Sequence, residues 1–270
     1  MTKGNLYKTI QAVEKSHKQA IETFFLNTYP SNHLISHGLE HHRRVWEYAK
    51  EIIRDSDIKI RAEKHFIEEL IIACFFHDIG MAINHGINHG DTSRKKTIEF
   101  LETTGMNPAD YIDALKAIEY HDDKEYIFQP GDNKVLEILS VADDLDAFGI
   151  TGIYRYAEIY LKRGISFREI GSRINKNALF RFENIEKKTW LSVEFLQRQR
   201  ERYNYLINFF RNYNSQLESY NFNSEKPAGP CGVIQILSGS DEPDFTKHTE
   251  TYYNDLFISD FFIKLTAEKD

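Results

Sequence analysis

Two side chains that can bind a metal ion stand next to each other where an apolar segment ends. Residues 66–76 form a mostly apolar run, and His77 and Asp78 follow it directly, ahead of Gly80. An imidazole and a carboxylate at the end of a buried helix cost desolvation free energy unless another group compensates them. A divalent cation would compensate them, because neutral imidazole and ionised carboxylate both bind such ions. The alternative is a histidine that interacts with the negative end of a helix dipole.

Further metal-binding residue types occur before and after this pair. His37 and His41 are four residues apart, which places them on one face of a helix if the helix includes both. Three aspartates, Asp143, Asp144 and Asp146, stand in a later apolar segment. A histidine, the adjacent pair and one aspartate can converge on one ion in a helical bundle. Such a mixed donor set suits Mn²⁺, Fe²⁺ or Zn²⁺, and Mg²⁺ is an alternative.

Helical geometry separates the three aspartates. A turn of about 100° per residue places Asp144 on a polar arc, and Asp143 and Asp146 on an apolar arc beside Leu136 and Leu139. We therefore expect Asp144 to face solvent and the other two to face the core. A carboxylate directed into a core requires a cation or several hydrogen-bond donors. Both core-facing aspartates stay candidates, and hydrogen bonds from backbone amides alone are the alternative partner for Asp143.

The order of these residues resembles that of the HD superfamily of metal-dependent phosphohydrolases. Residues 41–45 are similar to its His-x-x-Arg-Val opening, and residues 77–80 to its His-Asp-Ile-Gly box. Residues 142–149 resemble an Ala-Asp-Arg-Leu-Asp-Ala-x-Gly segment of a bacterial subgroup of predicted phosphohydrolases. The resemblance spans about residues 37–213. It implies an HD-domain helical bundle in which Asp146 supports the ligands, and it implies four metal ligands: His41, His77, Asp78 and Asp143.

The resemblance also implies a reaction. A divalent metal would activate a water molecule against a phosphate ester or anhydride, and a nucleotide is the leading substrate class. Two alternatives stay open: a phosphodiesterase for a nucleotide signal, and a non-catalytic regulatory protein that binds metal or nucleotide. The regulatory reading is favoured by two departures from the family pattern. Met81 stands where many members have Lys, and Asp144 stands where the subgroup has Arg.

Other histidines are secondary candidates. His89 and His121 stand at the edges of expected helices, and related enzymes use histidines from this interval for a second metal or for proton transfer to the leaving group. We expect both to be catalytic; the alternative is a pair of exposed loop histidines. His85 is a weaker candidate in an Asn- and Gly-rich loop. We expect His37 to support a ligand or cap a helix, and His42 to face solvent.

Hydrophobic periodicity predicts an all-α body that carries these residues. Residues 80–90 combine Asn and Gly and predict a loop. Charged side chains within the later helices, including Arg155, are expected at the surface. The predicted helices cover residues 4–28, 39–54, 62–78, 91–101, 108–121, 134–148, 153–162, 167–179 and 189–217.

The composition changes after Tyr220. Residues 223–232 are loop-like, residues 233–237 fit a short strand, and the aromatic-rich residues 252–265 fit either strand or helix. We therefore expect a helical HD-type domain over residues 1–219 and an irregular C-terminal appendage over residues 220–270. Its aromatic side chains should be buried against the body or against a partner chain.

Composition narrows the classes of partner. The chain has 270 residues, is 41% hydrophobic and carries a net charge of −7, which argues against a nucleic-acid ligand and leaves a small phosphorylated substrate open. No apolar run reaches membrane-spanning length, and residues 1–5 lead into a charged pattern without a signal-peptide core. Two cysteines, Cys74 and Cys231, make no disulfide framework. We expect a cytoplasmic protein, and a homo-oligomer stays open.

Overall fold

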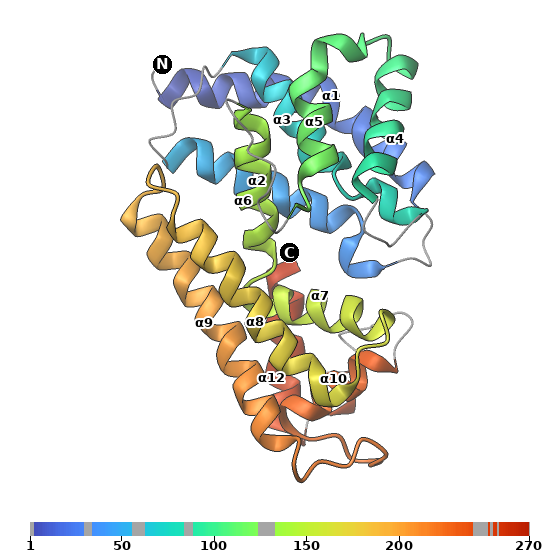
Figure 1. The fold of residues 1–270 in the computed structure, drawn as a ribbon, viewed down its shortest axis with the longest axis vertical. Helices are drawn as coiled ribbons and strands as arrows, with labels where there is room; N and C mark the ends of the chain where they lie inside the picture. The colour runs from blue at the N-terminus through green and yellow to red at the C-terminus, as the bar shows by residue number, and fades with distance from the viewer. Residues whose placement is uncertain are drawn as a thin grey trace. The chain divides into compact units, whose positions relative to one another are not determined.

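The computed structural model describes residues 3–29, 34–55, 63–83, 89–123, 133–239, 248, 251–252 and 254–269 (Figure 1). Within these ranges the regular structure is helical and no strand occurs, which confirms the all-α prediction. No described helix is long and apolar enough to cross a membrane. The expectations for His85, and for the aromatic residues Phe245 and Tyr253, fall outside the described residues.

The chain forms two compact units. The first contains α1 to α5 and α6 as far as Leu145, together with Thr189–Ser192. The second contains Leu34–Ser36 and the chain from Asp146 onward, except for Thr189–Ser192. A boundary at residues 219 and 220, as expected from composition, stays a prediction.

The first unit is built around an apolar helix. Every residue from Ile67 to Phe76 in α3 is buried, because this helix is apolar on nearly all sides and packs on α1, α2, α4 and α5. Its elements are α1 (Lys3–Thr28), α2 (Leu39–Asp55), α3 (Lys64–Phe76), η2 (Ile79–Ala82), α4 (His89–Thr103), η3 (Pro108–Tyr111), α5 (Ile112–Tyr120) and α6 (Lys134–Asp146). The helix α4 begins two residues earlier than expected, so His89 is its first residue.

The second unit packs its helices around α7 and α9. Both α8 and α7 lie against α9, while α10 and α12 lie against α7 and against each other. Its elements are η1 (Ile35–His37), of which His37 belongs to the first unit, α7 (Gly149–Lys162), α8 (Phe167–Glu186), α9 (Val193–Gln216), α10 (Gly229–Ser238) and α12 (Leu256–Lys269).

The segment after Tyr220 is more helical than expected. The strand expected at residues 233–237 is wrong, because these residues lie in α10, which has a proline in its first turn. A short apolar run does not distinguish a strand from a buried helix. The aromatic residues of this segment contact α8 and α9: Phe222 stacks on Phe167 with ring centroids 4.2 Å apart, and Phe261 lies 5.6 Å from Phe209.

Candidate metal centre

Four predicted ligands meet inside the first unit. The chain brings His41 from α2, His77 and Asp78 from the end of α3, and Asp143 from α6 so close that one ligand atom of each lies within 4.8 Å of the others. The Nε2 atoms of His41 and His77 are 3.1 Å apart. The Oδ2 atom of Asp78 lies 3.6 Å from each of these nitrogens, and Oδ1 of Asp143 lies 3.7 and 3.8 Å from them. All four side chains are buried.

Local backbone structure orients the adjacent pair. The helix α3 ends at Phe76, His77 keeps right-handed helical geometry, and Asp78 leaves it with φ of −105° and ψ of 6°. The Nδ1 atom of His77 donates to the carbonyl oxygen of Cys74 at 3.0 Å, which leaves Nε2 as the atom that faces the cluster. A hydrogen bond of this kind is the usual way to select the tautomer of a metal-binding histidine.

A second cluster shares Asp78 with the first. The Oδ1 atom of Asp78 lies 3.0 Å from Nε2 of His121 and 3.2 Å from Nε2 of His89, and these two nitrogens are 3.2 Å apart. The Nδ1 atom of His121 donates to the carbonyl oxygen of Ile118 at 2.7 Å. The two oxygens of Asp78 therefore face different histidine pairs. His89 and His121 are buried, so their alternative reading as exposed loop histidines is wrong.

The electrostatics of the two clusters favour an ionised Asp78. Burial alone would raise the pKa of Asp78, but His77, His121, His41 and His89 outweigh burial and hold this pKa well below its ordinary value. Burial lowers the pKa of His121, against the opposite effect of Asp78. For His77, burial is outweighed by Asp78 and Asp143, and the pKa is raised. Buried carboxylates among imidazoles are a donor set that fits a divalent transition-metal ion.

Two side chains expected in solvent are buried. His42 has no exposed surface; its Nδ1 donates to the carbonyl oxygen of Cys74 at 3.1 Å, and its Nε2 has no hydrogen-bond partner among the described residues. Burial, followed by the charges of His77 and His41, holds the pKa of His42 well below its ordinary value. Asp144 is 2% exposed. Both expectations were wrong because they assumed that one side of the helix meets solvent.

Asp146, at the end of α6, has a buried ion-pair partner that the sequence analysis did not predict. Arg155, expected at the surface, is 7% exposed, and its Nη1 lies 3.0 Å from Oδ2 of the fully buried Asp146. This pair gives Asp146 a partner other than a metal ion. The signal in the sequence is an arginine within the apolar stripe of α7, but its partner depends on tertiary contacts that periodicity does not reveal.

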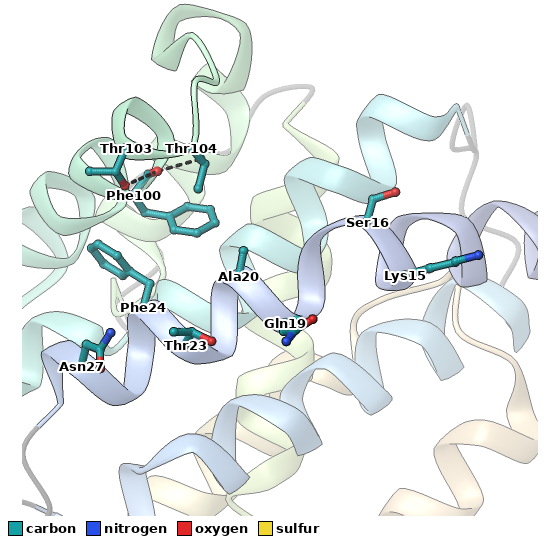
Figure 2. A pocket seen from close by; sticks show the side chains of 10 residues that line it. All are labelled: Lys15, Ser16, Gln19, Ala20, Thr23, Phe24, Asn27, Phe100, Thr103 and Thr104. Carbon is teal, nitrogen blue, oxygen red and sulfur yellow. Dashed lines mark hydrogen bonds between the residues drawn. The ribbon is translucent and has the colours of Figure 1, made fainter.

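A groove on the first unit lies apart from both clusters. It is about 520 Å³ in volume and is lined by residues of α1, by residues of α4 and by Thr104 directly after α4, none of which belongs to either cluster (Figure 2). Its aromatic residues, Phe24 and Phe100, meet edge to face with centroids 5.4 Å apart. The hydroxyl groups of Thr103 and Thr104 both donate to the carbonyl oxygen of Phe100 (Figure 2). The described residues that line the groove include no His, Cys, Asp or Glu, so they offer no common metal ligand.

Comparisons with known proteins agree with the geometry. A family model described as HD domain matches residues 38–147, a range that contains all six histidines and aspartates of the two clusters. The chain is similar to a crystal structure from Lactobacillus plantarum, solved as a structural genomics target, with a TM-score of 0.51 and 17% identity over 75% of this chain and 97% of that one. At this identity the likeness concerns the fold alone. No curated protein matches the chain.

Proposed function

We propose that this protein hydrolyses a phosphate ester or anhydride, because its residues 38–147 match the model of the HD domain, the fold of a family of metal-dependent phosphohydrolases. The observation that carries the proposal is Asp78, whose two oxygens each face a pair of histidines at 3.0 to 3.6 Å. A carboxylate so placed could offer one oxygen to each of the two histidine pairs that would hold a cation. A bound divalent cation would supply Lewis acidity, lowering the pKa of a water molecule and polarising a phosphate oxygen.

The residues of the first cluster would hold the cation. His41 and His77 offer Nε2, and Asp78 and Asp143 offer one carboxylate oxygen each. Two imidazoles and two carboxylates favour Mn²⁺, Fe²⁺ or Zn²⁺ over Mg²⁺, which prefers oxygen ligands. The carbonyl oxygen of Cys74 keeps His77 in the tautomer that presents Nε2.

The second cluster has two roles open to it. His89 and His121, with Oδ1 of Asp78, form a triad that fits a second cation. Alternatively, one histidine transfers a proton at Nε2 to the leaving group. Burial lowers the pKa of His121 and its Nδ1 donates to the carbonyl oxygen of Ile118, so the neutral imidazole presents an unprotonated Nε2, which suits a cation. To serve as a proton donor, His121 would first have to take up a proton at Nε2.

A nucleotide is the substrate class we favour, and a phosphodiesterase for a nucleotide signal is the alternative. The further alternative is a protein that retains the metal but has lost turnover. Met81 and Asp144 favour it, because neither supplies the positively charged side chain that related proteins have at its position. Both side chains are buried. A protein of this kind would bind cation and ligand without releasing phosphate.

Metal analysis followed by phosphate release tests the proposal. The protein, stripped by a chelator and reloaded with Mn²⁺, Fe²⁺, Zn²⁺ or Mg²⁺, is given a panel of nucleotides and phosphate esters. We expect Asp78→Asn to abolish metal retention and turnover, because it removes the charge that both clusters share. Asp260→Asn, at an exposed aspartate of α12, is the control and should retain both. Full activity of Asp78→Asn, or activity in excess chelator, would disprove the mechanism.

A second series ranks the aspartates of α6. Asn keeps the size of Asp and removes its charge, so we expect Asp143→Asn to lose the metal. Asp146→Asn should weaken metal binding indirectly, since it removes the negative charge that faces Nη1 of Arg155 at 3.0 Å. Asp144→Asn should leave metal binding unchanged. If Asp144→Asn were the variant that lost metal, the alignment to the HD family would be wrong.

A further inference from the structure

The first turn of α4 lies in close contact with two other backbone segments. A Cβ atom at Gly90 would lie 2.4 Å from the carbonyl oxygen of Glu119 in α5. A Cβ atom at Gly80, in η2, would lie 2.4 Å from the carbonyl oxygen of His89 and 2.6 Å from the backbone nitrogen of Ser93. Backbones at this distance leave no room for a side chain at either glycine.

This double contact assembles the second cluster. His89 is the first residue of α4 and is adjacent to Gly90. Asp78 stands two residues before Gly80, and His121 stands two residues after Glu119. A shift of α4 away from either neighbour would therefore lengthen the distances of 3.0 to 3.2 Å that join Asp78, His89 and His121.

A buried hydroxyl group joins two of these segments. The Oγ atom of Ser93 accepts a hydrogen bond from the backbone nitrogen of Gly80 at 2.9 Å, and Ser93 has no exposed surface. Ser93 lies four residues after His89 and so on the same face of α4. Its bond therefore connects the helix that carries His89 with the turn that follows Asp78.

We infer that Ser93 and Gly90 are positioning residues of the second cluster: they set where the first turn of α4 lies and hence where His89 meets Asp78 and His121. The inference rests on the proposed function and concerns residues without a ligand atom for the metal. Neither residue takes part in the first cluster, so their effect should be confined to His89 and His121. Replacing a group that orients a metal ligand weakens metal affinity by about 10- to 100-fold.

The test compares two buried hydroxyl groups of α4. Ser93→Ala removes the bond between elements, whereas Thr97→Val removes a hydroxyl whose bond, to the carbonyl oxygen of Ser93 at 2.8 Å, stays within α4. Both side chains are fully buried. Mn²⁺ binding to chelator-treated protein is measured by calorimetry and by thermal shift, and His121→Ala identifies the second site.

A glycine pair provides the second comparison. Gly90→Ala should push α4 away from α5, whereas Gly239→Ala, at the end of α10, would bring its Cβ no closer than 3.9 Å to the described atoms around it. We expect Ser93→Ala and Gly90→Ala to weaken second-site Mn²⁺ binding by about 10- to 100-fold and to leave the first site unchanged. Thr97→Val and Gly239→Ala should change neither. If the wild type binds one ion, the same ranking is expected in kcat at saturating Mn²⁺.

The outcomes separate this inference from the proposed function. Unchanged second-site binding and unchanged kcat in Ser93→Ala would overturn the inference and leave the function standing. Loss of both sites, or of folding, in Ser93→Ala would also overturn it, because the inference assigns Ser93 to the second cluster alone. A wild type that neither binds Mn²⁺ nor releases phosphate would overturn the proposed function, and the inference with it.

Discussion

Replacing His42 with Leu should stabilise the protein, although His42 is next to a proposed metal ligand. The imidazole is fully buried, and its Nε2 has no hydrogen-bond partner among the described residues. A buried acceptor left without a partner costs about 1 to 3 kcal/mol of stability. Leu is close to His in size and removes that acceptor, while the ring of Phe25, whose centroid is 4.6 Å from that of His42, offers an apolar neighbour.

The variant also loses one hydrogen bond. The Nδ1 atom of His42 donates to the carbonyl oxygen of Cys74, and such a bond contributes about 0.5 to 1.5 kcal/mol. The carbonyl oxygen does not become unsatisfied, because His77 donates to it as well at 3.0 Å. The removed penalty exceeds the lost bond, so we expect a net stabilisation of about 1 kcal/mol. The melting temperature of a protein of this size would rise by about 2 to 4 °C.

Urea denaturation in the presence of a chelator measures this effect, with a midpoint that rises while the slope stays constant. His17→Leu is the contrasting variant: Nε2 of His17 lies 3.1 Å from Oε1 of Glu68, so its loss should lower stability. A folded His42→Leu with reduced stability, or with weaker cation binding, would refute the reasoning. Either result would indicate that Nε2 of His42 interacts with another group in the folded protein in solution.

Two predictions concern carboxylates outside the clusters. The carboxylate of Glu268 accepts hydrogen bonds from the backbone nitrogen and the hydroxyl group of Thr151 at 2.8 and 2.9 Å, so it caps the N-terminus of α7. Glu268→Ala should lower the free energy of unfolding, measured by urea denaturation, by about 0.5 to 2 kcal/mol. An unchanged midpoint would contradict the capping role. Burial raises the pKa of Glu69, against the opposing effect of the backbone amides of α5. The stabilising contribution of Glu69 is therefore present below the ordinary Glu pKa and is lost as the pH rises through the raised pKa. Glu69→Gln should remove that loss, and the difference in unfolding free energy between Glu69→Gln and wild type should grow in favour of Gln above about pH 4.5; a difference that is constant with pH would contradict it.

The first cluster could be predicted because its residues carry local signals. His77 and Asp78 are adjacent, follow an apolar run and precede a glycine, and their positions follow from the end of one helix. The family resemblance supplied the choice of Asp143 over Asp146, which helical geometry left open. The pairing of Asp146 with Arg155 then explains how a second buried aspartate exists on the same helix. This pairing results from packing between helices, which hydrophobic periodicity does not predict.

The errors share a physical origin. A helical wheel assigns an arc to solvent, but residues 141–146 of α6 are buried on every side, so Asp144 had no solvent-facing arc to occupy. The same assumption placed His42 at the surface, whereas the rings of Phe25, His41 and His77 surround it. Polarity predicts exposure only where a helix has a free side, and the helices that carry a buried site have the least free surface.

The second cluster shows which part of a site needs the tertiary structure. His89 and His121 were singled out from their places at helix edges, but nothing local to either residue specifies that their rings approach. That approach depends on α4 lying against η2 and α5 at distances that exclude a Cβ at Gly80 and Gly90. Glycines next to catalytic residue types are therefore informative in a sequence: they mark where two backbones can come close enough for short side chains to meet at one carboxylate. In this protein that carboxylate is Asp78, and we expect replacement of either glycine to disturb the contact of its Oδ1 with His89 and His121.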